Sequence, residues 1–167
     1  PSCRRFPSYK LLLWEFTCLS RLFPKSQVFG AWKMGDFDFK TTQEVDQPMG
    51  SALLLRKEVI EQIGFMDERF YMFYNDVDLC YRIKKSGWKI YFYPEAKVLH
   101  YKGASTGQVK VKMIFLTHGG YFLFLKKHHS QGLKKILWLV FSLGLFITAL
   151  LRFEFYLIKK LMNRSGK

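Results

Sequence analysis

The sequence is poor in cysteine, and the few cysteines that it has show no pairing pattern. Cys3, Cys18 and Cys80 are odd in number, with no CxxC string or metal-type spacing. This argues against a disulfide scaffold or a zinc site. Cys80 falls on the apolar face of an expected helix, where a reduced thiol packs as a small hydrophobe. A reducing compartment, the cytoplasm or its membrane face, fits best.

Acidic residues are scarce at both ends of the chain. The formal net charge is +14, with six Lys and Arg against one acid in residues 1–35 and eleven against one in residues 110–167; residues 36–109 are nearly balanced. Basic ends attract anionic partners. Because Trp and Phe lie within apolar runs and no RNA-binding signature or zinc-finger spacing occurs, we expect an anionic membrane surface and no nucleic acid.

The longest uncharged run of the C-terminal region is slightly shorter than the length that usually spans a bilayer. Helical periodicity predicts helices at Met113–Lys127 and Leu133–Lys160. The uncharged run Ile136–Leu151 is only sixteen residues long, and Arg152 and Glu154 then interrupt it. Spanning, re-entrant and interfacial placements therefore stay open, as does a hydrophobic hairpin packed on the domain.

The upstream region reads as a mixture of short helices and strands. Apolar spacing and breakers predict helices near Tyr9–Leu22, at Lys57–Ile63 before Gly64, and from an Asn75 cap to about Ser86. Alternation predicts strands at Glu44–Gln47, Lys89–Tyr93 and Lys97–Tyr101, with a buried strand at Ala52–Leu55.

Residues 45–105 carry five short motifs in a fixed order. They read VDQPMG, GFMDERF, NDVDLCYR, GWKIYFYP and HYKGAS. This block resembles the second half of the catalytic domain of bacterial family 2 inverting glycosyltransferases, especially the rhamnosyltransferase-like branch that builds cell-surface polysaccharides. The resemblance covers about sixty central residues, and it implies a GT-A fold, a nucleotide-sugar donor and a divalent metal, Mg²⁺ or Mn²⁺.

Asp76 is the candidate catalytic residue. Inverting transfer needs one carboxylate to take the proton of the acceptor hydroxyl, on a rigid element that faces the cleft. The first turn of a helix provides such a position, and its dipole favours a negative charge. Local chemistry alone favours a carboxylate that only stabilises the start of the helix. The resemblance places the general base at Asp76.

The neighbours of Asp76 are candidates for acceptor binding or for structure. Asn75 stands where the family most often has Glu, so it keeps a capping role but lacks a charge. Asp78 precedes Arg82 by four residues, at the spacing of a helical ion pair. For Asp78 and Asn75 we favour structural or acceptor-orienting roles over direct chemistry.

Two further residues match the acceptor side of the family, and Trp88 is a third candidate. Asp46 and Gly50 fall in the segment that lines this side, and Gly50 permits close backbone approach. Trp88 is equally suited to stack on a sugar ring or to pack in the core. We include all three among the substrate-binding candidates.

His100 is the candidate metal ligand, since some family members use a histidine here beside the donor diphosphate, and imidazole suits Mn²⁺. The alternative is a histidine bonded to backbone. The strings Asp36-Phe-Asp38 and Asp76-Val-Asp78 do not follow a buried strand, as the family's metal motif does. That motif is expected upstream of Pro1.

The expected fold is therefore α/β: the C-terminal part of a GT-A-like, Rossmann-related mixed sheet in residues 1–109, followed by a basic, helical, membrane-associated tail in residues 110–167. The chain starts without an initiator Met, and we expect a fragment that is inactive alone. The expected function is inverting transfer of a hexose or deoxyhexose to a lipid-linked or polysaccharide acceptor at the cytoplasmic face of the membrane. A non-enzymatic membrane-binding module and a degenerate glycosyltransferase relic are the alternatives.

Overall fold

The computed structural model describes residues 2–99 and 110–165. The chain divides into two compact units, Pro1–His100 and Tyr101–Lys167. Each unit is described by itself.

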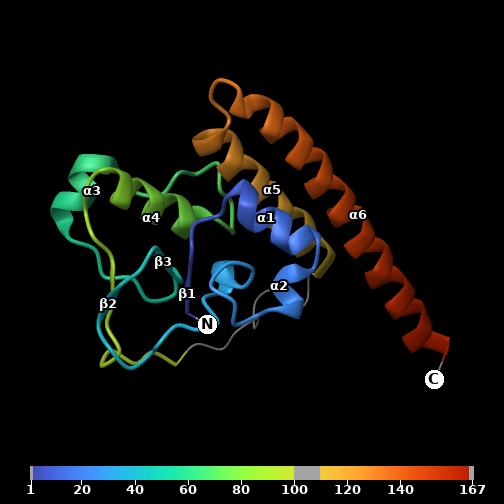
Figure 1. Ribbon diagram of the computed structural model, residues 1–167, viewed down its shortest axis with the longest axis horizontal. Coiled ribbons are helices and arrows are strands. Elements are labelled where there is room, and N and C mark those ends of the chain that lie inside the picture. Colours follow the sequence, from blue (N-terminus) through green and yellow to red (C-terminus); the bar gives the residue numbers. More distant parts are fainter. Residues whose placement is uncertain (1, 100–109, 166–167) are drawn as a thin grey trace. The chain divides into compact units, whose positions relative to one another are not determined.

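The first unit mixes short helices with very short strands (Figure 1). Its elements in chain order are β1 (Cys3–Arg4), α1 (Tyr9–Phe16), α2 (Leu19–Leu22), the 3₁₀ helix η1 (Ala31–Lys33), β2 (Gln43–Glu44), β3 (Gln47–Pro48), α3 (Lys57–Ile63), α4 (Asn75–Lys85) and β4 (Tyr91–Phe92). β1 pairs antiparallel with β3, and β2 pairs antiparallel with β4. The α/β class is confirmed, but the described residues form two two-stranded pairs rather than an extended GT-A-like sheet.

The core of this unit lies between α3 and α4. Val59 of α3 and Leu79 and Ile83 of α4 are buried together. The partly buried side chains packed against them are Leu55, Ile63, Met66, Trp88 and Ile90. Gly64 ends α3 with a φ of +72°, a conformation that suits glycine. This packing fixes α4, on which most of the candidate site residues lie.

Four predicted elements of this unit are wrong in part. The strand expected at Glu44–Gln47 is interrupted between β2 and β3, and the described part of the strand expected at Lys97–Tyr101 is not a strand. Ala52–Leu55 is not a strand. Leu55 packs on the core, but Leu54 is 101% exposed, so the segment is not buried as a whole. The helix expected over Tyr9–Leu22 is two helices, since Cys18 adopts a left-handed φ of 59° between them. Such a residue breaks the i to i−4 ladder of an α-helix.

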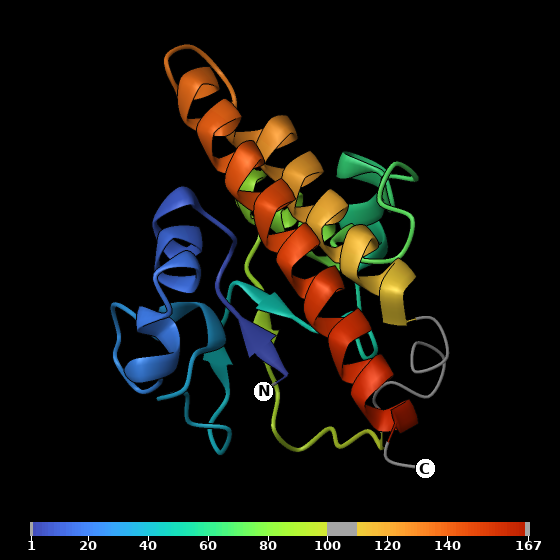
Figure 2. The ribbon, with the colours of Figure 1, turned by 90° about the vertical axis from the view of Figure 1, so that its right-hand side faces the viewer.

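The second unit is a pair of helices, α5 (Lys110–His129) and α6 (Lys134–Ser165). Figures 1 and 2 show them side by side, joined by a short turn. Aromatic contacts hold the pair together: the ring centroids of Phe122 and Trp138 lie 5.2 Å apart, and those of Phe115 and Phe153 lie 5.9 Å apart. Both helices fall where the periodicity predicts them.

Helix α6 contains a stretch, Lys134–Met162, that is long and apolar enough to cross a membrane by length and composition. Much of its apolar surface is exposed in the part of the chain that the structure describes. Its large exposed apolar side chains are Ile136, Leu137, Leu139, Val140, Leu143, Phe146, Ile147, Leu150, Leu151, Phe155, Leu157, Ile158, Leu161 and Met162. This surface is what membrane association of the helix requires.

Candidate active site

The site is built around the first turn of α4, which starts in an uncommon way. Tyr74 precedes the helix with a left-handed φ of 69° and is 7% exposed, so its buried ring holds a backbone conformation that is strained for a residue other than glycine. The sequence predicts Asn75 as the cap of this helix, but in the structure Asn75 is the first helical residue. Its side-chain oxygen instead accepts a hydrogen bond from the N–H of Asp76 at 2.8 Å.

The fold brings together Asp76 and Gly50, which the sequence singles out separately. The N–H of Gly50 donates to Oδ2 of Asp76 at 2.8 Å, across 26 residues of chain. A Cβ at position 50 would lie 2.9 Å from the Cβ of Asp76 and 3.1 Å from its Oδ2. A side chain would therefore force the two segments apart, so this contact requires glycine.

The Asp76 carboxylate is oriented by backbone donors on both oxygens. Its Oδ1 accepts from the N–H of Val77 at 2.9 Å, while Oδ2 accepts from Gly50. Among residues 2–99 and 110–165 it takes part in none of the ion pairs found. The side chain is half-buried, and a carboxylate oxygen with one N–H partner has a lone pair left for another donor. A substrate hydroxyl is such a donor.

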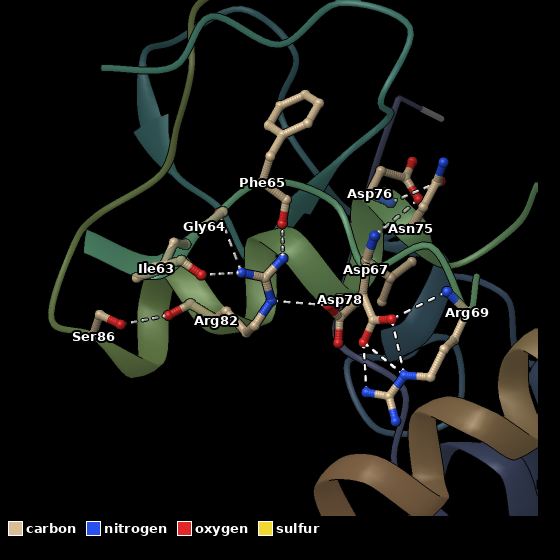
Figure 3. Close-up of polar contacts among 11 residues, drawn as sticks. Ile63, Gly64, Phe65, Asp67, Arg69, Asn75, Asp76, Asp78, Arg82 and Ser86 are labelled. Carbon is tan, nitrogen blue, oxygen red and sulfur yellow. Dashed lines mark hydrogen bonds and ion pairs between the residues drawn. The ribbon is translucent and has the colours of Figure 1, made fainter. Parts of the chain in front are cut away.

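Asp78 and Arg82 form a buried structural pair. The Asp78 side chain is fully buried, and its Oδ2 accepts from Nε of Arg82 at 2.9 Å. The guanidinium also donates to the carbonyls of Ile63, at 2.7 Å, Gly64 and Phe65, as Figure 3 shows. These carbonyls belong to the last residue of α3 and the two residues after it, where a helix leaves acceptors unsatisfied. Arg82 therefore ties α4 to the end of α3.

Asp46 belongs to an ion-pair cluster centred on Lys84 of α4. The Lys84 ammonium lies 3.1 Å from Oδ1 of Asp46 and 3.0 Å from Oε1 of Glu44, and Arg5 approaches Asp46 at 3.8 Å. Burial disfavours the lysine charge, but the hydrogen bonds to both carboxylates outweigh it and raise the pKa of Lys84. The hydrogen bond from Lys84 lowers the pKa of Glu44. The cluster anchors the 44–46 segment on α4.

Trp88 packs mainly with the core. Its indole is among the partly buried groups against the core of α3 and α4, and its Nε1 donates to Oε1 of Gln62 at 2.7 Å. A ring held in this way has little freedom to stack on a sugar. The structure thus favours the packing alternative for Trp88 over the stacking alternative.

The described residues contain no cluster of three or more His, Cys, Asp or Glu side chains that could hold a metal ion. Asp38 of the first D-x-D string accepts locally from the N–H of Lys40 and the hydroxyl of Thr41, as in a loop turn. In the second string, the Asp78 carboxylate forms an ion pair with Arg82. His100, the proposed metal ligand, lies outside the described residues. The residues described here therefore do not fit a metal centre.

Comparison with known proteins explains the motif order. The model of the family described as "Glycosyltransferase like family 2" matches residues 26–114, more than half of the chain. The chain belongs to this family. The match includes Gly50, Asp76 and the whole of α4, and it confirms the resemblance drawn from the five motifs.

Curated relatives of this family 2 chain act on sugars. It is 41% identical over 81 residues to the N-acetylglucosaminyl-diphospho-decaprenol L-rhamnosyltransferase of Mycobacterium tuberculosis, covering 48% of this chain and 26% of the relative. It is 28% identical over 118 residues to a dTDP-rhamnosyl transferase of Shigella flexneri, covering 65% of this chain and 38% of the relative. A low-salt glycan biosynthesis hexosyltransferase of Haloferax volcanii is 37% identical over 46 residues, 28% of this chain and 15% of the relative.

The chain spans about a quarter of the length of the mycobacterial relative and less than two fifths of the Shigella relative. No solved structure matches it.

Sequence reasoning missed three contributions to the family 2 site. The left-handed Tyr74 had no signal, because tyrosine rarely adopts this conformation. The bonds from Arg82 to the carbonyls after α3 depend on the packing of two helices. The pairing of the Lys84 ammonium with Glu44 and Asp46 was not foreseen, since it joins α4 to a segment that lies far away in the sequence.

Proposed function

We propose that residues 1–109 are the acceptor-side half of an inverting glycosyltransferase catalytic domain, with Asp76 as its general base. The reaction is transfer of a hexose or deoxyhexose from a nucleotide sugar to a lipid-linked or polysaccharide acceptor. The observation that carries the proposal is the half-exposed Asp76 carboxylate at the start of α4, held at 2.8 Å by the N–H of Gly50. Family membership supports glycosyl transfer as the class of reaction.

The proposed chemistry assigns one step to Asp76. Its carboxylate removes the proton from an acceptor hydroxyl while that oxygen bonds to the anomeric carbon of the donor. The bond from this carbon to the nucleotide diphosphate breaks, and the diphosphate leaves with the electron pair. Attack from the face opposite the leaving group inverts the anomeric configuration. The N–H groups of Gly50 and Val77 hold the carboxylate in a single orientation for this step.

The names of the relatives support the sugar and acceptor classes. Two relatives are rhamnosyl transferases, and the name of one specifies a diphospho-decaprenol acceptor. A deoxyhexose donor and a lipid-linked acceptor follow as proposals for this chain. A lipid-linked acceptor lies at a membrane, and we propose that residues 110–167 hold the enzyme at its cytoplasmic face through the apolar surface of α6.

The divalent metal in this proposal is implied only by membership of the family. Family 2 enzymes generally use Mg²⁺ or Mn²⁺, which neutralises charge on the leaving diphosphate. The described residues form no metal centre, so its ligands would lie elsewhere, with His100 as the proposed contribution of this chain.

The test is Asp76→Asn in the complete polypeptide that carries this chain. Loss of a general base should lower turnover by about 10²–10⁴-fold. Asp36→Asn, which changes an exposed carboxylate in a loop, is the matched control and should retain activity. Turnover is measured with nucleotide-activated deoxyhexoses, and the anomeric configuration of the product is read by NMR. Wild-type turnover in Asp76→Asn, or retained configuration, would refute the proposal.

A further inference from the structure

A turn in the first unit presents apolar side chains to solvent. The 21–29 turn (Arg21–Phe29) comprises the last two residues of α2 and the segment that follows it, and three of its large apolar residues are strongly exposed: Leu22 by 69%, Phe23 by 52% and Val28 by 48%. Exposed apolar side chains gathered on one short turn indicate an interaction surface more often than single exposed residues do. Nothing in the glycosyl transfer proposed above uses them.

The turn is anchored from behind by close backbone packing. A Cβ at Gly30 would lie 2.2 Å from the carbonyl oxygen of Pro24, and one at Gly35 would lie 2.4 Å from the same oxygen. The ring of Phe29 makes an edge contact with Trp14 at 5.0 Å between centroids. The exposed side chains of the turn are therefore carried by closely packed backbone rather than by a flexible loop.

The backbone of the turn satisfies many of its own polar groups. The N–H of Ser26 donates to the carbonyl of Phe23 at 3.1 Å, and the N–H of Gly30 donates to the carbonyl of Ser26 at 2.9 Å. The Ser26 hydroxyl oxygen accepts from the N–H groups of Val28 and Phe29, each at 3.2 Å. A segment that enters the lipid interface needs such internal bonding, since unsatisfied backbone groups are costly away from water.

The charge of the turn selects the kind of surface that it meets. Exposed Arg21 and Lys25 flank the apolar tip, and residues 16–35 contain no acid. Basic side chains beside exposed Leu and Phe match an anionic lipid interface, where cations meet phosphates and apolar groups reach the acyl boundary.

We propose that the 21–29 turn is a membrane-docking element that inserts Leu22, Phe23 and Val28 into an interface containing anionic phospholipid. It belongs to the first unit, whereas α6 belongs to the second. The proposal does not depend on the role of Asp76, so Asp76→Asn should leave docking unchanged.

The experiment uses an environment-sensitive fluorophore on the exposed Cys18, which lies next to α2; Cys3 and Cys80 are buried. The full chain is mixed with phosphatidylcholine vesicles that do or do not contain phosphatidylglycerol. We expect the probe to shift to the blue and to be quenched by nitroxide-labelled lipids, with the larger effect on the anionic vesicles. A matched probe on Leu54→Cys in a Cys18→Ser background reports a distant exposed position of the same unit.

Lipid quenching of the Cys18 probe that exceeds that of the position 54 probe, and that is lost with Leu22→Ser and Phe23→Ser, distinguishes insertion of the turn from recruitment of the whole chain by α6. Equal lipid quenching of the two probes would overturn the proposal. A blue shift of the Cys18 probe that follows protein concentration without lipid would also overturn it, in favour of contact between copies of the chain.

Two pairs of substitutions then test the chemistry. Leu22→Ser with Phe23→Ser should lower the ratio of inserted to free turn by about tenfold or more. Arg21→Gln with Lys25→Gln should lower it by about fivefold per charge on anionic vesicles and hardly at all on neutral ones. Leu54→Ser and Lys85→Gln are the controls, because they remove exposed side chains of the same types elsewhere. Insertion that survives both pairs of substitutions would refute the assignment.

Discussion

Two carboxylates that stand two residues apart on α4 have opposite environments. Asp78 is fully buried and paired with Arg82 at 2.9 Å, whereas Asp76 is half-buried and receives backbone N–H groups. A spacing of two residues turns a helical side chain to nearly the opposite face. The same residue type therefore stabilises the fold on one face and is half-exposed on the other. The two carboxylates of this D-x-D string lie in separate environments and do not form one metal motif.

The largest expected difference between the two faces is in stability. Asp78→Ala leaves the Arg82 charge without its buried partner and should lower the free energy of unfolding by about 3 kcal/mol. Asp76→Asn should cost about 1 kcal/mol or less, since only a partly exposed charge at a helix start is lost. Urea unfolding followed by circular dichroism compares them. Equal losses in the two variants would show that the faces do not differ as the structure indicates.

Gly50→Ala should sharpen the role of the Asp76 face. The new methyl would lie 2.9 Å from the Cβ of Asp76, and overpacking of this kind typically costs about 1–3 kcal/mol. Because the clash is with the Asp76 side chain, the same substitution should cost less in an Asp76→Gly background. A double-mutant cycle of unfolding free energies measures this coupling. Additive effects would place the strain of Gly50→Ala elsewhere.

Lys84→Met tests the cluster that anchors the 44–46 segment to α4. The lysine side chain is 25% exposed and Glu44 40%, so solvent screening limits the expected cost to about 1 kcal/mol. Because the pKa of Glu44 is lowered in the folded state, its ionised form adds stability at pH values above its pKa in the unfolded chain. This stability is lost as the pH falls through its pKa in the folded chain. The cost of Lys84→Met should therefore be largest near neutral pH and shrink in acid. Lys84→Arg, which keeps the charge, should recover most of the stability, and a cost independent of pH would contradict this account.

The last expected effect is absent at neutral pH and concerns Cys80, buried on the inner side of the same helix. Burial, helped by the negative charge of Asp76, raises the pKa of this thiol from 9.0 to about 12. The folded state then keeps the proton that the unfolded state loses, so stability is complete below pH 9 and declines between pH 9 and about 12. Cys80→Ala should show a shallower decline when unfolding is measured across this range. Identical slopes would mean that the thiol ionises equally easily in the folded chain.

The sequence anticipated the elements whose signals are local. Apolar spacing before Gly64 predicted the bounds of α3, and apolar spacing up to about Ser86 predicted most of the length of α4. The Gly50–Asp76 contact was not foreseen as a contact, although the family pattern singled out both residues. What failed was decided by tertiary packing: the left-handed Tyr74 displaced the expected cap, and the Ala52–Leu55 run, apolar enough for a buried strand, lies on the surface with no paired strand in the described structure.

The packing of Pro24 against Gly30 and Gly35 separates the shape of the 21–29 turn from its surface chemistry. The shape rests on main-chain atoms, on two glycines and on the Ser26 hydroxyl, and not on Leu22 or Val28. Substitutions at Leu22 or Val28 would thus change what the turn binds, whereas Phe23 also contacts the Phe29 ring, with 5.7 Å between centroids. The sequence of such a turn can diverge quickly between related enzymes, or be changed by protein engineering, while the neighbouring strands and helices keep their structure.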